Sequence, residues 1–194
     1  NVAVSALTAR RYGQNKRDNA NAILSTTVLF VIISSLILGG ILALFAPQIM
    51  NICGSTPETH DDAVLYYRIV MSCMIFNCIQ MCINSAQRGV GNTRITMRTN
   101  ITSNVVNIIM NYFLINGHLF FPALGIAGAA IATVIGTVVS CIMSILSITK
   151  KDNFISIPYI IEHKIKPSWL AFKNLVSVGY SVFFEQILMR LGFM

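Results

Sequence analysis

One carboxylate lies inside an apolar stretch of this sequence: Glu185, in residues 181–192, SVFFEQILMRLG. A charge is costly to bury in a hydrophobic helix, so such a group is by default a candidate proton carrier, cation ligand or counter-ion for a cationic substrate. The alternative is a structural ion pair with Arg190. An offset of five residues is poor for a pair on one helix, where three or four is preferred, so the spacing favours ion chemistry.

A second set of polar side chains consists of carboxamides within apolar runs. In residues 100–111, NITSNVVNIIMN, asparagine recurs at helical spacing. At about 100° per residue these side chains fall within an arc of about 60°; they are Asn100, Asn104, Asn107 and Asn111. An amide that faces lipid leaves polar groups unsatisfied, at a cost of several kcal/mol. The stripe is therefore expected to face other helices or a hydrated cavity.

The preceding apolar run carries a matching stripe, within an arc of about 80°. Its members are Asn77, Gln80, Asn84 and Gln87. Any one amide could act as an interhelical hydrogen bond, which contributes about 0.6 kcal/mol on average in a well-studied case. Eight amides on two stripes favour a hydrated path or cavity between the two helices.

The elements that must position these groups are membrane-spanning helices. Of the 194 residues, 55% are hydrophobic and 11% charged, with a mean hydropathy of +0.68. A soluble domain has about 25% charged residues. Runs long enough for a span, which takes about 20 residues, lie at about 23–47, 63–87, 99–116 and 123–148, and a fifth begins near Trp169. Residues 1–9 continue an earlier helix, so we expect a piece of a longer polypeptide.

Charge predicts the orientation of these spans. Three segments, 10–21, 88–98 and 149–173, hold twelve of the fourteen Lys and Arg residues, whereas segments 48–62 and 116–122 hold none. Basic loops face the cytoplasm, so these three are predicted to be cytoplasmic and the protein to lie in the cell (plasma or inner) membrane. The net charge of +7 is clustered between uncharged runs, which argues against nucleic-acid binding. Segment 149–173 is either an interfacial amphipathic segment or an ordinary loop.

Small residues line the fourth span at four-residue spacing, which lets helix backbones approach closely. The two rows are Gly125, Ala129 and Thr133, and Gly128, Ala132 and Gly136. The Thr133 hydroxyl is in addition a possible ion ligand. The five cysteines form no ligand or disulfide pattern, and the three histidines fall singly in loops. No zinc-protease motif, catalytic carboxylate pair or nucleophile elbow occurs, so an enzyme is not expected.

Five stretches, in order and at characteristic spacing, resemble the multidrug and toxic compound extrusion (MATE) transporters. They are SALTARRYGQNKRDNAN, QRGVGNTRITMRTNI, VVNIIMNYFLING, FPALGIAGAAIAT and VGYSVFFEQILMRLG. The resemblance implies an all-α integral membrane fold, a polytopic helix bundle of twelve helices in two six-helix lobes. Residues 1–148 would belong to the N-terminal lobe, from the end of its second helix to its sixth. Residues 149–168 would be the cytoplasmic inter-lobe loop and 169–194 the truncated seventh helix, which begins the C-terminal lobe.

The same resemblance implies a secondary active transporter. It would export organic, often cationic, compounds by Na⁺ or H⁺ antiport with alternating access. No cofactor is implied beyond the coupling ion, and no metal beyond Na⁺ at the coupling site. The implied partners are small organic substrates and membrane lipids, with the full-length protein acting as a monomer. The alternative is a lipid-linked oligosaccharide flippase of the same superfamily, whose cavity would carry several cationic residues.

The resemblance also implies roles for individual residues. In many members the first lobe binds its cation through an Asp on the first helix, an Asn and an Asp one turn apart on the fifth, and a Thr on the sixth. Asn107 and Thr133 match the Asn and Thr positions, whereas Asn111 stands where those members have Asp. Glu185 matches a seventh-helix acid found in part of the family. The substrate-cavity candidates are Asn77, Gln80, Asn84 and Asn104.

Overall fold

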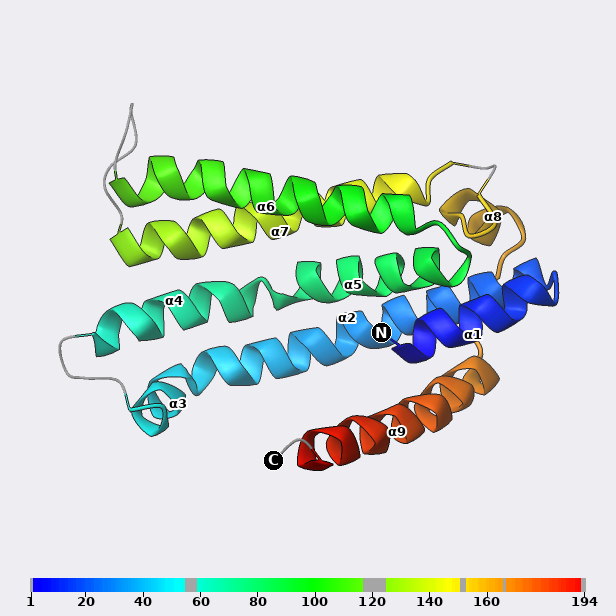
Figure 1. Ribbon diagram of the computed structural model, residues 1–194, viewed down its shortest axis with the longest axis horizontal. Helices are drawn as coiled ribbons and strands as arrows, with labels where there is room; N and C mark the ends of the chain where they lie inside the picture. The colour runs from blue at the N-terminus through cyan, green and yellow to red at the C-terminus, as the bar shows by residue number, and fades with distance from the viewer. Residues whose placement is uncertain (1, 55–58, 117–124, 151–152, 166, 193–194) are drawn as a thin grey trace. The chain divides into compact units, whose positions relative to one another are not determined.

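The fold consists of helices joined by short connections (Figure 1). The computed structural model describes residues 2–54, 59–116, 125–150, 153–165 and 167–192, except for eight side chains: 116, 183, 185, 186 and 189–192. The helices are α1 (Val2–Gly13), α2 (Arg17–Leu44), α3 (Ala46–Ile52), α4 (His60–Ser72), α5 (Met74–Gly89), α6 (Thr93–Asn116), α7 (Gly125–Ser147), α8 (Ile157–Glu162) and α9 (Trp169–Gly192). No strand occurs within these ranges, so the all-α prediction is confirmed.

Several of these helices are long and apolar enough to cross a membrane. Within the described ranges, α2 and α7 meet this condition singly, and α4 and α5 meet it together as one span bent by 47°. Helices α6 and α9 each have 24 residues, a length of about 36 Å at 1.5 Å per residue. A hydrocarbon core is about 30 Å thick, so their length also suffices, although amides and basic residues interrupt their apolar surface.

Helices occupy each predicted run, but α2 and α6 begin at Arg17 and Thr93, before the runs that start at 23 and 99. Two further differences have a local cause. The run 23–47 ends earlier than predicted, because α2 stops at Leu44 and Pro47 lies in the first turn of α3, where its missing N–H has no helical partner to lose. The run 63–87 is broken at Cys73 between α4 and α5. No proline or glycine signals this break, but the Ser72 hydroxyl donates to the Arg68 carbonyl at 2.7 Å. Such back-bonding bends helices.

The described residues pack as two compact units that follow spatial proximity and not chain order. The first unit comprises residues 1–30, 81–96 and 144–194, and the second comprises residues 31–80 and 97–143. Most long helices contribute one part to each unit. The predicted division of the chain at residues 148 and 168 stays a prediction.

The first unit is held together by α1, α2 and α9. Leu7, Ile23 and Ala171, one from each of these helices, form a buried apolar cluster, with Leu175 and Val178 of α9 packed against it. Figure 1 shows α1 and α9 running close together.

Helix α5 approaches α1 closely within the same unit. A Cβ placed on Gly89 would lie 2.6 Å from the Ser5 carbonyl oxygen, so only glycine allows this contact.

The segment before α8 is anchored to the start of α2, also within the first unit. The Arg17 guanidinium donates to the carbonyls of Asn153 (2.6 Å) and Phe154 (3.1 Å). Asn21 Nδ2 donates to the Phe154 carbonyl at 3.1 Å, and Asn21 Oδ1 accepts the Ser156 N–H at 3.1 Å. Hydrogen bonds therefore hold the connection between α7 and α9 to the start of α2.

The second unit is built around the antiparallel pair α6 and α7. A Cβ on Gly128 would meet the Leu114 carbonyl oxygen at 2.5 Å, and one on Gly136 would meet the Ser103 carbonyl oxygen at 2.9 Å. Ala132, between the two glycines, is fully buried. The packing interpretation of the row that contains Gly128, Ala132 and Gly136 is thus confirmed, and this close approach brings the polar groups of the two helices within reach of one another.

Candidate functional site

The structure brings together three of the four predicted coupling residues, in the second unit. Asn111 Nδ2 donates to Asn107 Oδ1 at 3.0 Å, and Asn107 Nδ2 donates to Thr133 Oγ1 at 3.3 Å. The Thr133 hydroxyl donates in turn to the Ala129 carbonyl at 2.9 Å. These bonds form one polar chain from α6 into α7, in which each hydroxyl or amide donates toward the α7 backbone.

The hydrogen-bonded chain ends, at α6, in an amide oxygen that accepts no hydrogen bond from the described residues. Asn111 Oδ1 is buried and has no hydrogen-bond partner among the described residues. A buried acceptor without a partner costs free energy, so a native structure that keeps one commonly serves a ligand or a water. Oxygen atoms are the ligands that hard cations prefer. Asn111 Oδ1, together with the remaining lone pair of Thr133 Oγ1, could therefore contribute to a cation or proton-donor site.

Close packing of α6 and α7 keeps this chain in place. Two serine hydroxyls cross the same helix pair: Ser103 Oγ donates to the Gly136 carbonyl at 3.0 Å, and Ser140 Oγ donates to the Thr99 carbonyl at 3.2 Å. These serines were not predicted as contacts. The contact of Ser140 could have been predicted from its position, since Ser140 continues the four-residue row of small residues after Gly136.

Three of the four predicted cavity residues also lie in the second unit. Gln80 Nε2 donates to Asn100 Oδ1 at 3.4 Å, which links the two amide stripes between α5 and α6. Asn77, Asn100 and Asn104 are exposed. These amides therefore present polar groups at the surface of the described unit, as residues that line a hydrated path must.

The fourth cavity candidate, Asn84, lies in the first unit in a different environment. It is 4% exposed, and its Oδ1 accepts from the Ser144 hydroxyl at 3.1 Å. Its neighbour on the stripe, Gln87, is 1% exposed and donates to Ser147 Oγ at 3.4 Å. The α5 stripe is thus divided: its last two amides bond to α7 serines, as interhelical hydrogen bonds do, and its first two are more accessible.

The remaining predicted group, Glu185, belongs to α9. Its side chain and that of Arg190 lie outside the described part of the structure, so the ion-coupling role and the alternative ion pair both stay predictions. Elsewhere, no group of three or more His, Cys, Asp or Glu side chains that could hold a metal is found in the described ranges. His118 lies outside them.

Long apolar helices with an amide chain between them define a polytopic helical membrane protein. The family follows from comparison: the chain belongs to the MatE family, whose model matches residues 1–113. This confirms the resemblance inferred from the five sequence stretches.

Curated relatives agree with this assignment. The "Probable multidrug resistance protein YoeA" of Bacillus subtilis (strain 168) is 26% identical over 188 residues, which cover 97% of this chain and 41% of that protein. A "Probable multidrug resistance protein NorM" of Bacillus cereus (strain ATCC 10987 / NRS 248) is 28% identical over 188 residues, with 95% of this chain and 41% of that protein covered. The chain thus spans about two fifths of the length of these relatives.

Solved structures share the fold. A MATE crystal structure in the bent conformation superposes with a TM-score of 0.85 at 21% identity, over 98% of this chain and 41% of that one. An inward-facing multidrug resistance MATE family transporter of the MOP superfamily superposes with a TM-score of 0.82, also at 21% identity, over 92% of this chain and 39% of that one. The described part of this chain therefore has the fold of part of a MATE transporter.

Proposed function

We propose that the full-length protein is a secondary active transporter that exports small organic, often cationic, compounds by antiport with Na⁺ or H⁺. Family membership and the names of the relatives as multidrug resistance proteins support export of organic compounds. The family consists of transporters and not of enzymes, in agreement with the absence of catalytic motifs from the sequence.

The observation that carries the proposal is the polar chain of Asn111, Asn107 and Thr133 with its unpartnered Oδ1. A coupling ion needs a site within the membrane. An amide oxygen that is buried without a partner between two apolar helices is available as a ligand for such an ion. In the proposed cycle, an ion bound there would rearrange the chain and bias the packing of α6 against α7.

Coupling requires that ion and substrate bind the two transport states with different affinities. Asn111 cannot change its charge, so proton coupling would need another group. Glu185 has the required carboxylate, and we propose that it carries the proton or binds Na⁺ together with groups of the second lobe. We propose that the organic substrate contacts amides along the hydrated path. These are Asn77, Gln80, Asn104 and Asn84, the last of which is buried in this structure.

The proposed setting is the cell membrane, with segments 10–21, 88–98 and 149–173 on the cytoplasmic side and the protein acting as a monomer. The charge asymmetry of the connecting segments supports this orientation. To test it, the native cysteines, including the exposed Cys53, are replaced by Ser and a single cysteine is introduced into segment 10–21 or 48–62. Each variant is then treated with an impermeant thiol reagent. Only the cysteine in segment 48–62 should react from outside intact cells.

The transport proposal is tested with the full-length protein in proteoliposomes that contain a fluorescent organic cation. Asn111→Leu removes the unpartnered oxygen but keeps the branched shape of the side chain, and it should reduce ion-driven transport at least about tenfold, the effect of about 1.4 kcal/mol. Asn51→Leu, at an exposed amide of α3, is the matched control and should leave transport unchanged.

A second variant tests the acid. Glu185→Gln should abolish the dependence of efflux on the ion gradient. Undiminished efflux with unchanged ion dependence in this variant would remove Glu185 from the mechanism. Translocation of a labelled lipid-linked oligosaccharide by a protein that transports no organic cation would instead establish the flippase alternative.

A further inference from the structure

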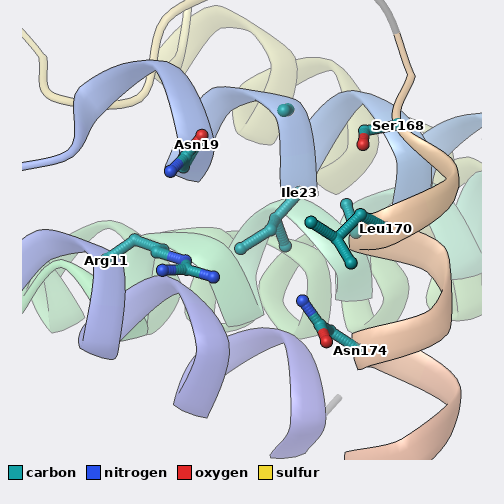
Figure 2. Close-up of a pocket in the computed structure, with 8 residues that line it drawn as sticks. Arg11, Asn19, Ile23, Ser168, Leu170 and Asn174 are labelled. Atoms are coloured by element: carbon teal, nitrogen blue, oxygen red, sulfur yellow. The ribbon is translucent and has the colours of Figure 1, made fainter.

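A small pocket in the first unit lies between the end of α1, the start of α2 and the start of α9, away from the amide chain. Its volume is about 80 Å³, several times the roughly 10–15 Å³ that one water needs. Figure 2 shows Arg11, Asn19, Ile23, Ser168, Leu170 and Asn174 around it. The pocket combines a cation, two carboxamides and a hydroxyl with apolar side chains.

The polar side of the pocket offers one hydrogen-bond donor that lacks a partner among the described residues, the Nε atom of Arg11. Arg11 Nη1 donates to Gln14 Oε1 at 3.0 Å. The Nε atom of the same guanidinium is buried and has no hydrogen-bond partner among the described residues. A buried guanidinium N–H without an acceptor is costly, and a planar guanidinium matches the oxygens of carboxylate or phosphate. The pocket is therefore suited to an oxyanion.

The surrounding charges and dipoles favour the same ligand. Leu170 and Ala171 lie in the first turn of α9, where the first N–H groups have no helical acceptor and the helix dipole attracts anions. Ser168 directly precedes this helix, and its N–H donates to Thr26 Oγ1 at 3.0 Å. No acidic residue is among the described residues that line the pocket. The carboxylate nearest in sequence, Asp18, accepts a hydrogen bond from the Tyr159 hydroxyl at 2.7 Å, which is part of a separate contact with α8.

The other side of the pocket opens onto apolar surface. Leu170 is 66% exposed and the adjacent Trp169 is 78% exposed, and tryptophan is enriched at the boundary between lipid and water. Arg10, Lys16 and Lys173, all exposed, add positive charge near the same helix ends. A free oxyanion would contact only the polar side of the pocket, whereas an amphiphile with an anionic head group would contact the polar side and the apolar side.

We propose that this pocket binds the phosphate group of an anionic phospholipid. Arg11 and the first turn of α9 hold the phosphate oxygens, Asn19 and Asn174 donate from the sides, and an acyl chain lies along Leu170 and Trp169. The site joins α9 to α1 and α2 next to the cluster of Leu7, Ile23 and Ala171. A lipid bound only when these helices are packed together stabilises that packing. The binding proposal does not depend on the proposed transport function.

Trp169 supplies the probe, because it is the single tryptophan of this chain and follows the pocket residue Ser168. The full-length protein, with any tryptophan elsewhere replaced by Phe, is placed in phosphatidylcholine nanodiscs. Brominated phosphatidylglycerol or brominated phosphatidylcholine is added in increasing fractions, and quenching of Trp169 fluorescence is recorded. The anionic lipid should reach half-maximal quenching at a fraction about tenfold lower than the zwitterionic lipid does.

The variants separate a site from general attraction between charges. Arg11→Gln should abolish the tenfold preference, whereas Arg10→Gln, which removes the same charge from the neighbouring exposed position, should keep it. Asn174→Leu fills the pocket without changing charge and should also abolish the preference. Equal loss in the Arg10 and Arg11 variants, or full preference in both Arg11→Gln and Asn174→Leu, would overturn the proposal.

A final arm distinguishes lipid from free phosphate. Inorganic phosphate added to the wild-type protein should leave the quenching by brominated phosphatidylglycerol unchanged. If it displaces the brominated lipid from the wild-type protein but has no effect on Arg11→Gln, the pocket takes free phosphate and the lipid assignment is wrong.

Discussion

Gly128 provides a direct test of the helix packing that holds the amide chain. In the Gly128→Ala variant the new Cβ would lie 2.5 Å from the Leu114 carbonyl oxygen and 2.8 Å from its carbonyl carbon. The shorter distance is about 0.8 Å below the 3.3 Å lower end of ordinary C···O contacts. Both clashing atoms are backbone, so α7 must move away from α6 as a whole.

The expected effect follows from two opposing terms. Overpacking of a well-packed contact costs about 1–3 kcal/mol, whereas alanine is favoured over glycine in a helix by at most about 1 kcal/mol. Gly128→Ala should therefore lower the free energy of unfolding by up to about 2 kcal/mol. Gly40→Ala is the matched control, because nothing lies within 4 Å of the Cβ position at Gly40 in α2. It should leave stability unchanged or raise it by up to about 1 kcal/mol.

Unfolding can be followed in detergent with a thiol-reactive dye, because Cys82 and Cys141 are each only 2% exposed. The exposed Cys53 and the partly exposed Cys73 and Cys78 are first replaced by Ser so that they do not react before unfolding. The Gly128→Ala protein should unfold at a lower temperature than both the parent and the Gly40→Ala protein. A Gly128→Ala protein as stable as the Gly40→Ala protein would refute the close approach of α6 and α7.

Three further predictions address other contacts. Asn111→Asp introduces a carboxylate at the end of the amide chain, so ion-driven transport in proteoliposomes should gain a pH dependence that the parent protein lacks at this position; an unchanged pH profile would contradict a coupling role. Ser144→Ala removes a buried hydrogen bond to Asn84 and should lower the free energy of unfolding by about 1 kcal/mol, as measured by thermal unfolding; an unchanged unfolding temperature would argue against this contact. The hydrogen bond to Asp18 raises the pKa of Tyr159, with smaller contributions from desolvation and from the negative charge of Asp18. The bond therefore contributes stability at and below the ordinary tyrosine pKa, and this stability is lost as pH rises through the raised pKa. Asp18→Asn should move tyrosinate formation to lower pH in an absorbance titration, and an unshifted titration would refute the bond.

Much of the helical architecture could be predicted because the bilayer imposes a simple rule on composition. Long uncharged runs located α2 and α7. The start of α9 at Trp169 was predicted as well. The break at Cys73 was not, since no helix-breaking residue marks it; a serine hydroxyl bonded to the Arg68 carbonyl accompanies the bend.

The site was predictable in part for a related reason. Helical spacing placed Asn107 and Asn111 on one face, and the small residues of α7 indicated that this helix could come close. Spacing along one helix carries no information about which neighbour each amide meets. The difference between Asn84, buried against Ser144, and Asn77, exposed, therefore emerges only from packing. The pocket at Arg11 was missed because its residues come from two segments, 11–23 and 168–174, that are far apart in the chain.

The central claim is that this chain forms part of an ion-coupled exporter of organic compounds. The most direct measurement is efflux of a fluorescent organic cation from proteoliposomes of the full-length protein, with Na⁺ and pH gradients imposed separately. Efflux should accelerate under at least one of the two gradients and should return to the rate of empty liposomes when an ionophore dissipates it. Efflux that is indifferent to both gradients, or no efflux beyond that of empty liposomes, would contradict the account.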